Sequence, residues 1–296
     1  MRATRINLMA SKQCNNNCIF CLEDCNISKV EGFGNLAQAK KALEIKKVSS
    51  LREILFTGKE PTLNENLVDT IASLKTKAHA RISLITNGRR ISYKPYLNKL
   101  VNSGLDNIMV SIHGHTHSLH DALTRSPGSF KQTKLGLKNA MNIRNKAHLG
   151  LITTTTLTKM NYQKFDKIIN FLEKFKADAY IFNPVIPRGR ALLHKGAVLV
   201  DYSSISKEIQ KTLKKKKPGK IKVGLPSCLM GGFECFVGAR EKIIKITGER
   251  KSEEKYEGRK TKSKKCKRCS YYSGCDGVHK EYISLFGWKE FKPVLK

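Results

Sequence analysis

Short apolar stretches alternate with helical patterns over the first two thirds of the sequence. The apolar stretches are rich in β-branched residues, which is typical of buried strands. They cover residues 6–10, 52–56, 82–85, 107–112, 150–157 and 179–183. Apolar positions at helical spacing predict helices around residues 36–47, 65–76, 94–102, 131–146 and 162–175. Six strand–helix alternations with short links predict an α/β fold with a parallel sheet, in a partial, open (β/α)6 barrel of TIM-like type.

The alternation stops after about residue 190. Residues 201–215 give one more helical pattern, and a Lys/Pro/Gly segment at 214–219 leads into a loop-rich region. Charged residues dominate 249–265, which is typical of an exposed segment. We therefore expect two parts, a barrel over residues 1–191 and a small C-terminal extension over residues 192–296.

The composition is that of a globular protein with an unusual charge. Hydrophobic residues make up 40% of the 296 residues, and no apolar run approaches the length of a membrane span. The N-terminus lacks the apolar stretch of a secretory signal, so we expect a cytoplasmic protein without membrane contact. The 56 Lys and Arg exceed the 24 Asp and Glu, for a net charge of +32. This excess indicates either contact with a polyanion such as RNA or a solvated, lysine-rich surface.

The nine cysteines fall into two groups, one near the N-terminus and one after residue 227. An odd number of cysteines in a cytoplasmic protein argues against a disulfide framework, and close grouping is what a metal site needs. Cys14, Cys18 and Cys21 follow the first predicted strand, at the sheet edge where the sites of parallel barrels gather. Three thiolates at this spacing can hold three irons of a cubane and leave the fourth open to a ligand. A structural site with Cys25 as a fourth ligand is the alternative.

The spacing C-x3-C-x2-C after a first strand, with Phe20 before the last cysteine, resembles the radical S-adenosylmethionine superfamily. The turn after the second strand agrees with this resemblance. Phe56-Thr57-Gly58-Lys59-Glu60-Pro61 resembles the Gly-Gly-Glu-Pro turn of the family, with Lys59 in place of a glycine. The resemblance implies that Gly58 and Glu60 lie where the amino group of S-adenosylmethionine binds.

Other strand ends of the predicted barrel also resemble the family. Thr86-Asn87-Gly88 matches a common ending near the cofactor, and Ser111 and His113 occupy positions that face the ribose in relatives. Arg125 resembles the arginine that pairs with the methionine carboxylate in the family. The segment Pro187-Arg-Gly-Arg-Ala191, after the sixth predicted strand, also resembles a segment of the family. The resemblance implies that a [4Fe–4S] cluster and S-adenosylmethionine give a 5′-deoxyadenosyl radical, which abstracts a hydrogen atom from a substrate.

Four histidines lie close together after the fourth predicted strand, at positions 113, 115, 117 and 120. Because histidine is the commonest metal ligand, a zinc site is one interpretation. The four do not all share a face in a strand-end turn, so contact of His113 with the cofactor or substrate is the preferred interpretation.

The second group of cysteines includes the pattern C-x2-C-x5-C, with two more cysteines upstream. The three in the pattern are Cys266, Cys269 and Cys275, and the two upstream are Cys228 and Cys235. The pattern resembles the auxiliary-cluster extensions called twitch or SPASM. It implies one auxiliary [4Fe–4S] cluster bound by Cys228 and the three cysteines of the pattern, with Cys235 as the alternative to Cys228. A zinc site with four thiolates is the alternative to iron.

Relatives with such extensions often modify peptides, so we expect radical modification of a peptide or protein, with a reducing partner such as ferredoxin or flavodoxin. Radical modification of RNA such as tRNA is the competing enzyme hypothesis, because of the basic charge. A basic nucleic-acid-binding protein with structural metal sites is the competing hypothesis outside enzymology, and it predicts no turnover.

Overall fold

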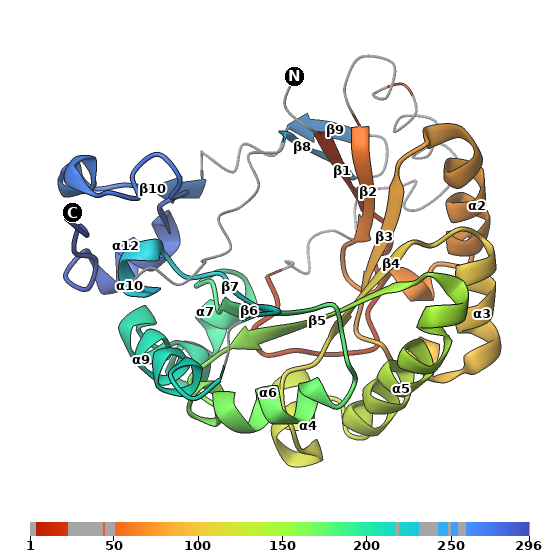
Figure 1. The fold of residues 1–296 in the computed structure, drawn as a ribbon, viewed down its shortest axis with the longest axis horizontal. Helices are drawn as coiled ribbons and strands as arrows, with labels where there is room; N and C mark the ends of the chain where they lie inside the picture. Colours follow the sequence, from red (N-terminus) through yellow and green to blue (C-terminus); the bar gives the residue numbers. More distant parts are fainter. Residues whose placement is uncertain are drawn as a thin grey trace.

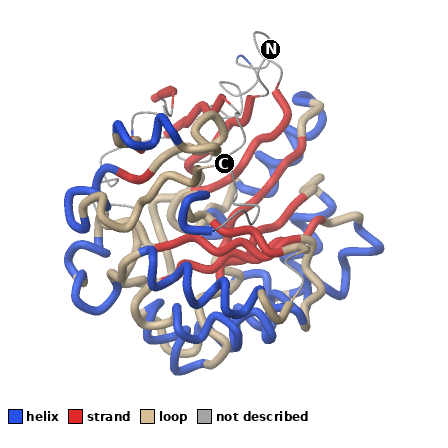
Figure 2. The backbone as a smooth tube through the Cα atoms, turned by 60° about the vertical axis from the view of Figure 1, so that its left-hand side comes forward, coloured by secondary structure: helices blue, strands red, loops and turns tan. Residues whose placement is uncertain are grey.

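Nine of the described strands lie side by side in one curved sheet, with most of the helices gathered on its outer side (Figure 1, Figure 2), and two short strands in the C-terminal part form a separate antiparallel pair. The structure is a computed structural model. It describes residues 4–22, 44, 51–216, 219–230, 242–247, 250–253 and 259–295. The strand order in the sheet is β7-β6-β5-β4-β3-β2-β1-β8-β9. Neighbouring strands from β7 to β8 are parallel, and β9 is antiparallel to β8.

The six predicted strands are all present, and they pair in sequence order. They are β1 (Thr4–Met9), β2 (Leu51–Thr57), β3 (Arg81–Thr86), β4 (Asn107–Ser111), β5 (Gly150–Leu157) and β6 (Ala179–Pro184). The larger helices are α2 (Leu67–Ala78), α3 (Lys94–Asn102), α4 (His117–Thr124), α5 (Ser129–Ala147), α6 (Phe165–Glu173) and α9 (Tyr202–Leu213). The helix predicted around residues 36–47 lies outside the described residues, apart from Glu44. The prediction of a parallel α/β sheet with helical crossovers is confirmed.

Residues alternate along β4, β5 and β6 between a buried outer face and a more exposed inner face. On β5, Leu151 and Leu157 are fully buried in the core that the sheet shares with the helices, whereas the alternate positions are partly exposed. On the inner face, the Ser83 hydroxyl donates to Glu53 Oε1 at 2.6 Å, and Asn107 Nδ2 donates to the Ser83 hydroxyl at 3.1 Å. A buried outer face is what a sheet covered by helices requires, and it leaves the concave side to a ligand.

The sheet continues beyond the six predicted strands, which corrects the expectation that the alternation ends near residue 190. β7 (Ile221–Val223) pairs with β6, and β8 (Lys242–Thr247) pairs with β1 at the opposite edge. β9 (Arg250–Glu253) completes that edge. β7 has only three residues, and β8 carries two lysines among its isoleucines, so neither gives a clear apolar run. The C-terminal part of the chain therefore borders the sheet on both sides.

Small elements build the rest of the C-terminal extension. They are α7 (Arg190–Leu193), α8 (Lys195–Val198), α10 (Ser227–Met230), β10 (Lys260–Thr261), η5 (Lys264–Arg268), β11 (Val278–His279) and α12 (Lys280–Phe286). Three short 3-10 turns belong to the barrel instead: η2 (Pro61–Leu63), η3 (Arg90–Ser92) and η4 (Tyr162–Lys164). No helix among the described residues has both the length and the apolar character that crossing a bilayer requires.

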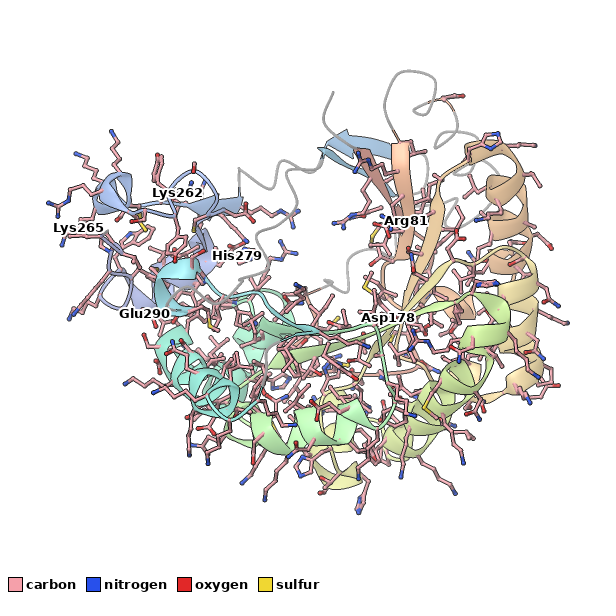
Figure 3. All side chains as sticks on the ribbon, in the orientation of Figure 1. Arg81, Asp178, Lys262, Lys265, His279 and Glu290 are labelled. Carbon is pink, nitrogen blue, oxygen red and sulfur yellow. The ribbon has the colours of Figure 1, made fainter. Side chains whose placement is uncertain are left out.

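A buried aromatic and carboxylate contact joins the C-terminal tail to α9. The rings of Tyr202 and Tyr282 are stacked with centroids 3.7 Å apart, and the Tyr202 amide donates to the Tyr282 hydroxyl at 2.8 Å. Glu290 accepts from the amide and hydroxyl of Ser203 at 2.6 and 2.7 Å, and from the Tyr282 hydroxyl. Figure 3 shows Glu290 at this junction. Glu290 therefore binds the first turn of α9 and α12 at once.

Replacing Glu290 by alanine is expected to lower the free energy of unfolding by about 2–3 kcal/mol, because charge-assisted hydrogen bonds to partly buried donors are lost. The measurement is urea unfolding of the metal-free protein. Lys289→Ala, at an exposed neighbouring position, is the control and is expected to leave the unfolding midpoint unchanged. Equal midpoints for the two variants would show that Glu290 does not hold the tail.

Candidate functional site

The three N-terminal cysteines lie on the loop that follows β1. None is in a disulfide, and Cys18 and Cys21 are partly buried whereas Cys14 is exposed. Burial raises the pKa of the Cys18 thiol, and the neighbouring thiols of Cys14 and Cys21 raise it further. The three thiols are thus within electrostatic reach of one another, and the Cys21 amide donates to the Cys18 carbonyl at 3.3 Å. The amide of Asn16 donates to Cys14 Sγ at 3.4 Å, as expected of a sulfur that binds as a thiolate.

Glu60 cross-links the turn after β2 to the turn after β3. Its Oε1 accepts from the amide and hydroxyl of Thr62 at 3.2 and 2.6 Å and from the Thr86 hydroxyl at 2.6 Å. Its Oε2 accepts from the Asn87 amide at 2.7 Å. Its own amide donates to the carbonyl of Gln13 in the cysteine loop at 2.9 Å. The carboxylate, only 1% exposed, thus fixes two strand ends against the cysteine loop.

Gly58 allows the turn after β2 to pass close to the end of β1. Its φ is +108°, and a Cβ at this position would lie 3.2 Å from Met9 Cε. Only glycine adopts this backbone conformation without strain. Lys59 beside it is partly buried, and the departure from the Gly-Gly-Glu-Pro pattern therefore leaves the turn intact.

Phe20 of the cysteine loop packs against His113, which lies in the turn after β4. Their ring centroids are 4.7 Å apart in an edge-to-face arrangement, and His113 stacks on His120 at 5.8 Å. Burial lowers the pKa of His113 to about 3 and that of His120 to about 4. The Thr156 amide donates to His113 Nδ1 at 3.2 Å, so the neutral ring carries its proton on Nε2. His113 is therefore neutral at neutral pH with a donor at Nε2, and its contact with the cofactor or substrate stays a prediction.

Backbone contacts occupy two histidines of this turn. The amide of His113 donates to His120 Nδ1 at 3.1 Å, so the backbone already uses one nitrogen of each ring. Among the described side chains, no group of three His, Cys, Asp or Glu residues is arranged to hold a single metal ion. The described structure therefore gives no support to the zinc interpretation of the four histidines.

Ser111 and Arg125 flank the same region. Ser111 ends β4 and is partly exposed, next to Thr154 of β5. Arg125 is exposed at the end of α4 in a left-handed conformation, with φ 49°. The Thr124 carbonyl accepts from the Asn17 amide at 2.8 Å, and the Ser126 hydroxyl donates to the Asn15 carbonyl at 3.4 Å. Arg125 thus lies beside the cysteine loop, and its pairing with a carboxylate stays a prediction.

Two arginines that the sequence analysis did not single out also contact the cysteine loop. Arg89, in the turn after β3, donates to the Asn15 carbonyl and to Asn16 Oδ1, and Arg190, which begins α7, donates to Asn17 Oδ1. The sequence carries only a weak signal that these arginines lie at the site. Arg89 follows Asn87 by two residues, and Arg190 lies in segment 187–191, which resembles the family. Asn161, fully buried, was also missed; it donates to the carbonyl of His113 at 2.9 Å.

The second set of cysteines gathers around one cavity in the extension. Cys228 comes from α10, and the three others come from the loops around η5 and before β11. Tyr271, Tyr272 and Trp288 complete the apolar part of the lining. Burial, followed by the thiols of Cys275, Cys269 and Cys266, raises the pKa of Cys228 to about 12. Cys235 and Cys25, the alternative ligands, lie outside the described residues.

Both sets of thiols converge, each around one volume. Among the described residues, no group of three or more His, Cys, Asp or Glu side chains is arranged to hold a single metal ion. Converging thiolates are the ligands of iron–sulfur clusters as well as of zinc.

A partial parallel barrel with converging thiols at the carboxyl ends of its strands defines a class of enzymes that place a metal cluster against a bound cofactor. The family model described as Radical SAM superfamily matches residues 9–172, which is more than half of the chain. The chain belongs to the radical S-adenosylmethionine (radical SAM) superfamily and is an enzyme of that superfamily, which implies a [4Fe–4S] cluster and S-adenosylmethionine as cofactors.

Two curated relatives are similar to this chain over part of its length. An AdoMet-dependent heme synthase of Methanosarcina barkeri is 28% identical over 179 residues, which are 60% of this chain and 49% of the relative. A probable GTP 3′,8-cyclase of Sulfurisphaera tokodaii is 30% identical over 210 residues, 69% of this chain and 61% of the relative. The chain thus aligns with about half to three fifths of the length of these relatives.

Solved structures share the fold at low sequence identity. Streptococcus suis SuiB bound to S-adenosylmethionine superposes with a TM-score of 0.65 at 14% identity, covering 99% of this chain and 76% of SuiB. The enzyme anSMEcpe with bound AdoMet superposes with a TM-score of 0.60 at 14% identity, covering 75% and 63% of the two chains. The match to SuiB includes the extension as well as the barrel.

Proposed function

We propose that this chain is a radical SAM enzyme that modifies a peptide or protein, with one [4Fe–4S] cluster on Cys14, Cys18 and Cys21 and an auxiliary cluster in the extension. The observation that carries the first site is the convergence of three thiols on a loop held by the ends of β2, β3 and β6. When bound, the cluster and S-adenosylmethionine supply a 5′-deoxyadenosyl radical for hydrogen abstraction.

Residues of this chain prepare the site for the cofactor. Glu60 fixes the turn whose backbone carbonyls would meet the methionine amino group, and Asn87 donates to Asn15 Oδ1 at 2.6 Å beside Cys14. Phe20 and the Nε2–H of His113 offer an aromatic edge and a donor to the adenosyl part. Ser111 and Arg125 would complete the ribose and carboxylate contacts.

The auxiliary cluster is proposed on Cys228, Cys266, Cys269 and Cys275. These four thiols line one cavity, and the C-x2-C-x5-C pattern with an upstream cysteine resembles auxiliary-cluster extensions, which supports iron–sulfur over zinc. Because a tail segment supplies three of the ligands and α10 the fourth, the site exists only when the tail is docked on α9. The contacts of Glu290 and Tyr282 keep it docked without metal.

A peptide is the preferred substrate class because the fold match that includes the extension is to SuiB, which one structure holds with the precursor peptide SuiA at a TM-score of 0.64. The concave face of the sheet carries polar side chains such as Glu53, Ser83 and Asn107 beside apolar ones. Such a face can hydrogen-bond the backbone and side chains of a peptide that enters the open side of the barrel. A reducing partner such as ferredoxin or flavodoxin would supply the electron.

Modification of RNA is the second candidate, favoured by the charge of the extension. Residues 259–295 contain ten Lys and Arg against three Asp and Glu, and η5 carries four of these cations. Lys265 points outward from the extension in Figure 3. Lys262 Nζ already covers one face of the Tyr272 ring at 4.3 Å, which takes that face from base stacking. Salt-sensitive binding of tRNA would favour this candidate, and no binding at low salt would remove it.

The test is anaerobic reconstitution with iron and sulfide, followed by dithionite and S-adenosylmethionine. We expect about eight irons per chain and formation of 5′-deoxyadenosine, which increases with the peptide substrate. About four irons with one zinc would overturn the auxiliary cluster alone. No 5′-deoxyadenosine and an iron content near zero would overturn the proposed function.

A further inference from the structure

The three residues between Cys14 and Cys18 are all asparagines, and a different side chain holds each of them. Asn87 Nδ2 donates to Asn15 Oδ1 at 2.6 Å. Arg89 donates to Asn16 Oδ1 at 2.9 Å and also to the Asn15 carbonyl. Arg190 donates to Asn17 Oδ1. The spacer is thus anchored by the turn after β3 on one side and by the start of α7 on the other.

The backbone of Arg190 and Gly189 also contacts the cysteine loop. The Arg190 amide donates to the Cys21 carbonyl at 3.0 Å. Gly189 has φ 58° and lies so close to the loop that a Cβ would come within 2.7 Å of the Cys21 carbonyl oxygen. Any larger residue would push the loop away. The turn after β6 therefore clamps the loop at both Asn17 and Cys21.

Arg89 is fixed from a second side as well. Its Nε donates to Gln132 Oε1 of α5 at 2.6 Å, and its amide donates to Asn87 Oδ1 at 3.0 Å. The contact with Gln132 fixes the guanidinium, and the contact with Asn87 fixes the backbone of Arg89. A guanidinium that is already held loses less freedom when it binds the loop.

Both guanidiniums bring a permanent positive charge to the loop. Burial and the other thiols raise the pKa of Cys18, and the charge of Arg190 acts in the opposite direction, which places this charge within electrostatic reach of the sulfur. The cluster on such a loop becomes more negative on reduction. A nearby cation stabilises the reduced form more than the oxidised form, and net charge is one of the factors that set cluster potentials.

We propose that Arg89 and Arg190 are positioning residues that hold the asparagine spacer and set the reduction potential of the cluster on Cys14, Cys18 and Cys21. This inference rests on the proposed function, because it assumes a cluster on that loop. The two arginines have separate effects. Their charge raises the potential, and their hydrogen bonds keep the thiols in place for iron.

The test is a redox titration of the reconstituted protein, followed by electron paramagnetic resonance of the reduced cluster, together with its iron content. The auxiliary site is removed by Cys269→Ala, so that one cluster gives the signal. Arg190→Gln and Arg89→Gln are each expected to lower the ratio of reduced to oxidised cluster about tenfold at a fixed potential, a shift of about 59 mV to more negative values. Arg190→Lys keeps the charge and is expected to restore most of the potential.

Two matched variants separate charge from position. Arg81→Gln removes the same charge from the start of β3, at the far end of the strand that leads to Arg89, and is expected to leave the potential unchanged. Figure 3 shows Arg81 on the sheet, away from the extension. Asn17→Ala keeps both arginines and cuts the contact with Arg190. It is expected to lower iron retention with little effect on the potential of the cluster that remains.

Failure of the inference differs from failure of the proposed function. Potentials of Arg190→Gln and Arg89→Gln equal to that of Arg81→Gln would overturn the inference while the cluster and its chemistry stand. If the reduction potential of Arg190→Lys is as low as that of Arg190→Gln, the charge of Arg190 does not set the potential, and that part of the inference is wrong. If the protein with both arginines assembles no cluster on the loop, the proposed function itself is wrong.

Discussion

Cys18→Ala is expected to abolish formation of 5′-deoxyadenosine, down to the level without enzyme. Cys18 is the middle thiol of the loop, partly buried and packed against the apolar cluster around Phe20. Two remaining thiolates leave a cluster with two irons without protein ligands, so the cubane is not retained in a form that binds S-adenosylmethionine. The measurement is 5′-deoxyadenosine by liquid chromatography after anaerobic reconstitution, with the iron content of the same sample.

The matched control is Cys228→Ala in the other set. It is expected to lower the iron content by about four per chain and to leave 5′-deoxyadenosine formation without substrate in place, because the two sites lie on separate segments. Turnover in Cys18→Ala at the wild-type level would assign the cleavage of S-adenosylmethionine to another part of the chain. Loss of turnover in both variants would instead couple the two sites.

Glu60→Gln is expected to abolish binding of S-adenosylmethionine and to lower the free energy of unfolding by about 3 kcal/mol. Each carboxylate oxygen accepts a backbone amide, Oε1 that of Thr62 and Oε2 that of Asn87. A glutamine offers one oxygen and one donor nitrogen, so one buried amide faces another donor, which costs about 1–3 kcal/mol besides the lost charge-assisted bonds. The turn after β2 then loses its fixed position against the cysteine loop.

Glu53→Gln is the control, because it is the same change near the other end of the same strand. Glu53 accepts from the Ser83 hydroxyl and lies 3.9 Å from an Arg5 nitrogen, contacts that a glutamine oxygen can largely keep, so about 1 kcal/mol or less is expected. Urea unfolding gives the stabilities, and calorimetric titration of the reconstituted protein with S-adenosylmethionine gives the affinities. Unchanged affinity and stability in Glu60→Gln would show that the carboxylate is dispensable.

The barrel could be predicted because its signals are local. Each of the strands β1 to β6 is a short apolar run, and parallel pairing follows from the helices between them. The cysteine loop could be placed at the carboxyl end of β1 for the same reason. The gathering of Cys228 with Cys266, Cys269 and Cys275 followed from resemblance, and the shared cavity agrees with it.

Contacts between distant turns could not be predicted. Arg190 and Asn17 are 173 residues apart, and Arg89 and Asn16 are 73 apart, so no periodicity or spacing connects them. Arginines and asparagines are also ordinary surface residues. The strand β8 was missed because its partner β1 is near the other end of the chain, and strand pairing over such a separation leaves no local pattern.

The pairing of β1 with β8 has a consequence for how the protein is made. Residues 4–9 leave the ribosome on the order of 10–50 s before residues 242–247, at ordinary rates of synthesis. During this time one edge of the first strand has no neighbour, which is a template for wrong pairing and a source of slow folding. The cysteine loop adjoins this edge. Iron that is delivered during synthesis therefore binds while the free edge of β1 is still unpaired. Iron that is delivered after release binds after β8 has paired with that edge.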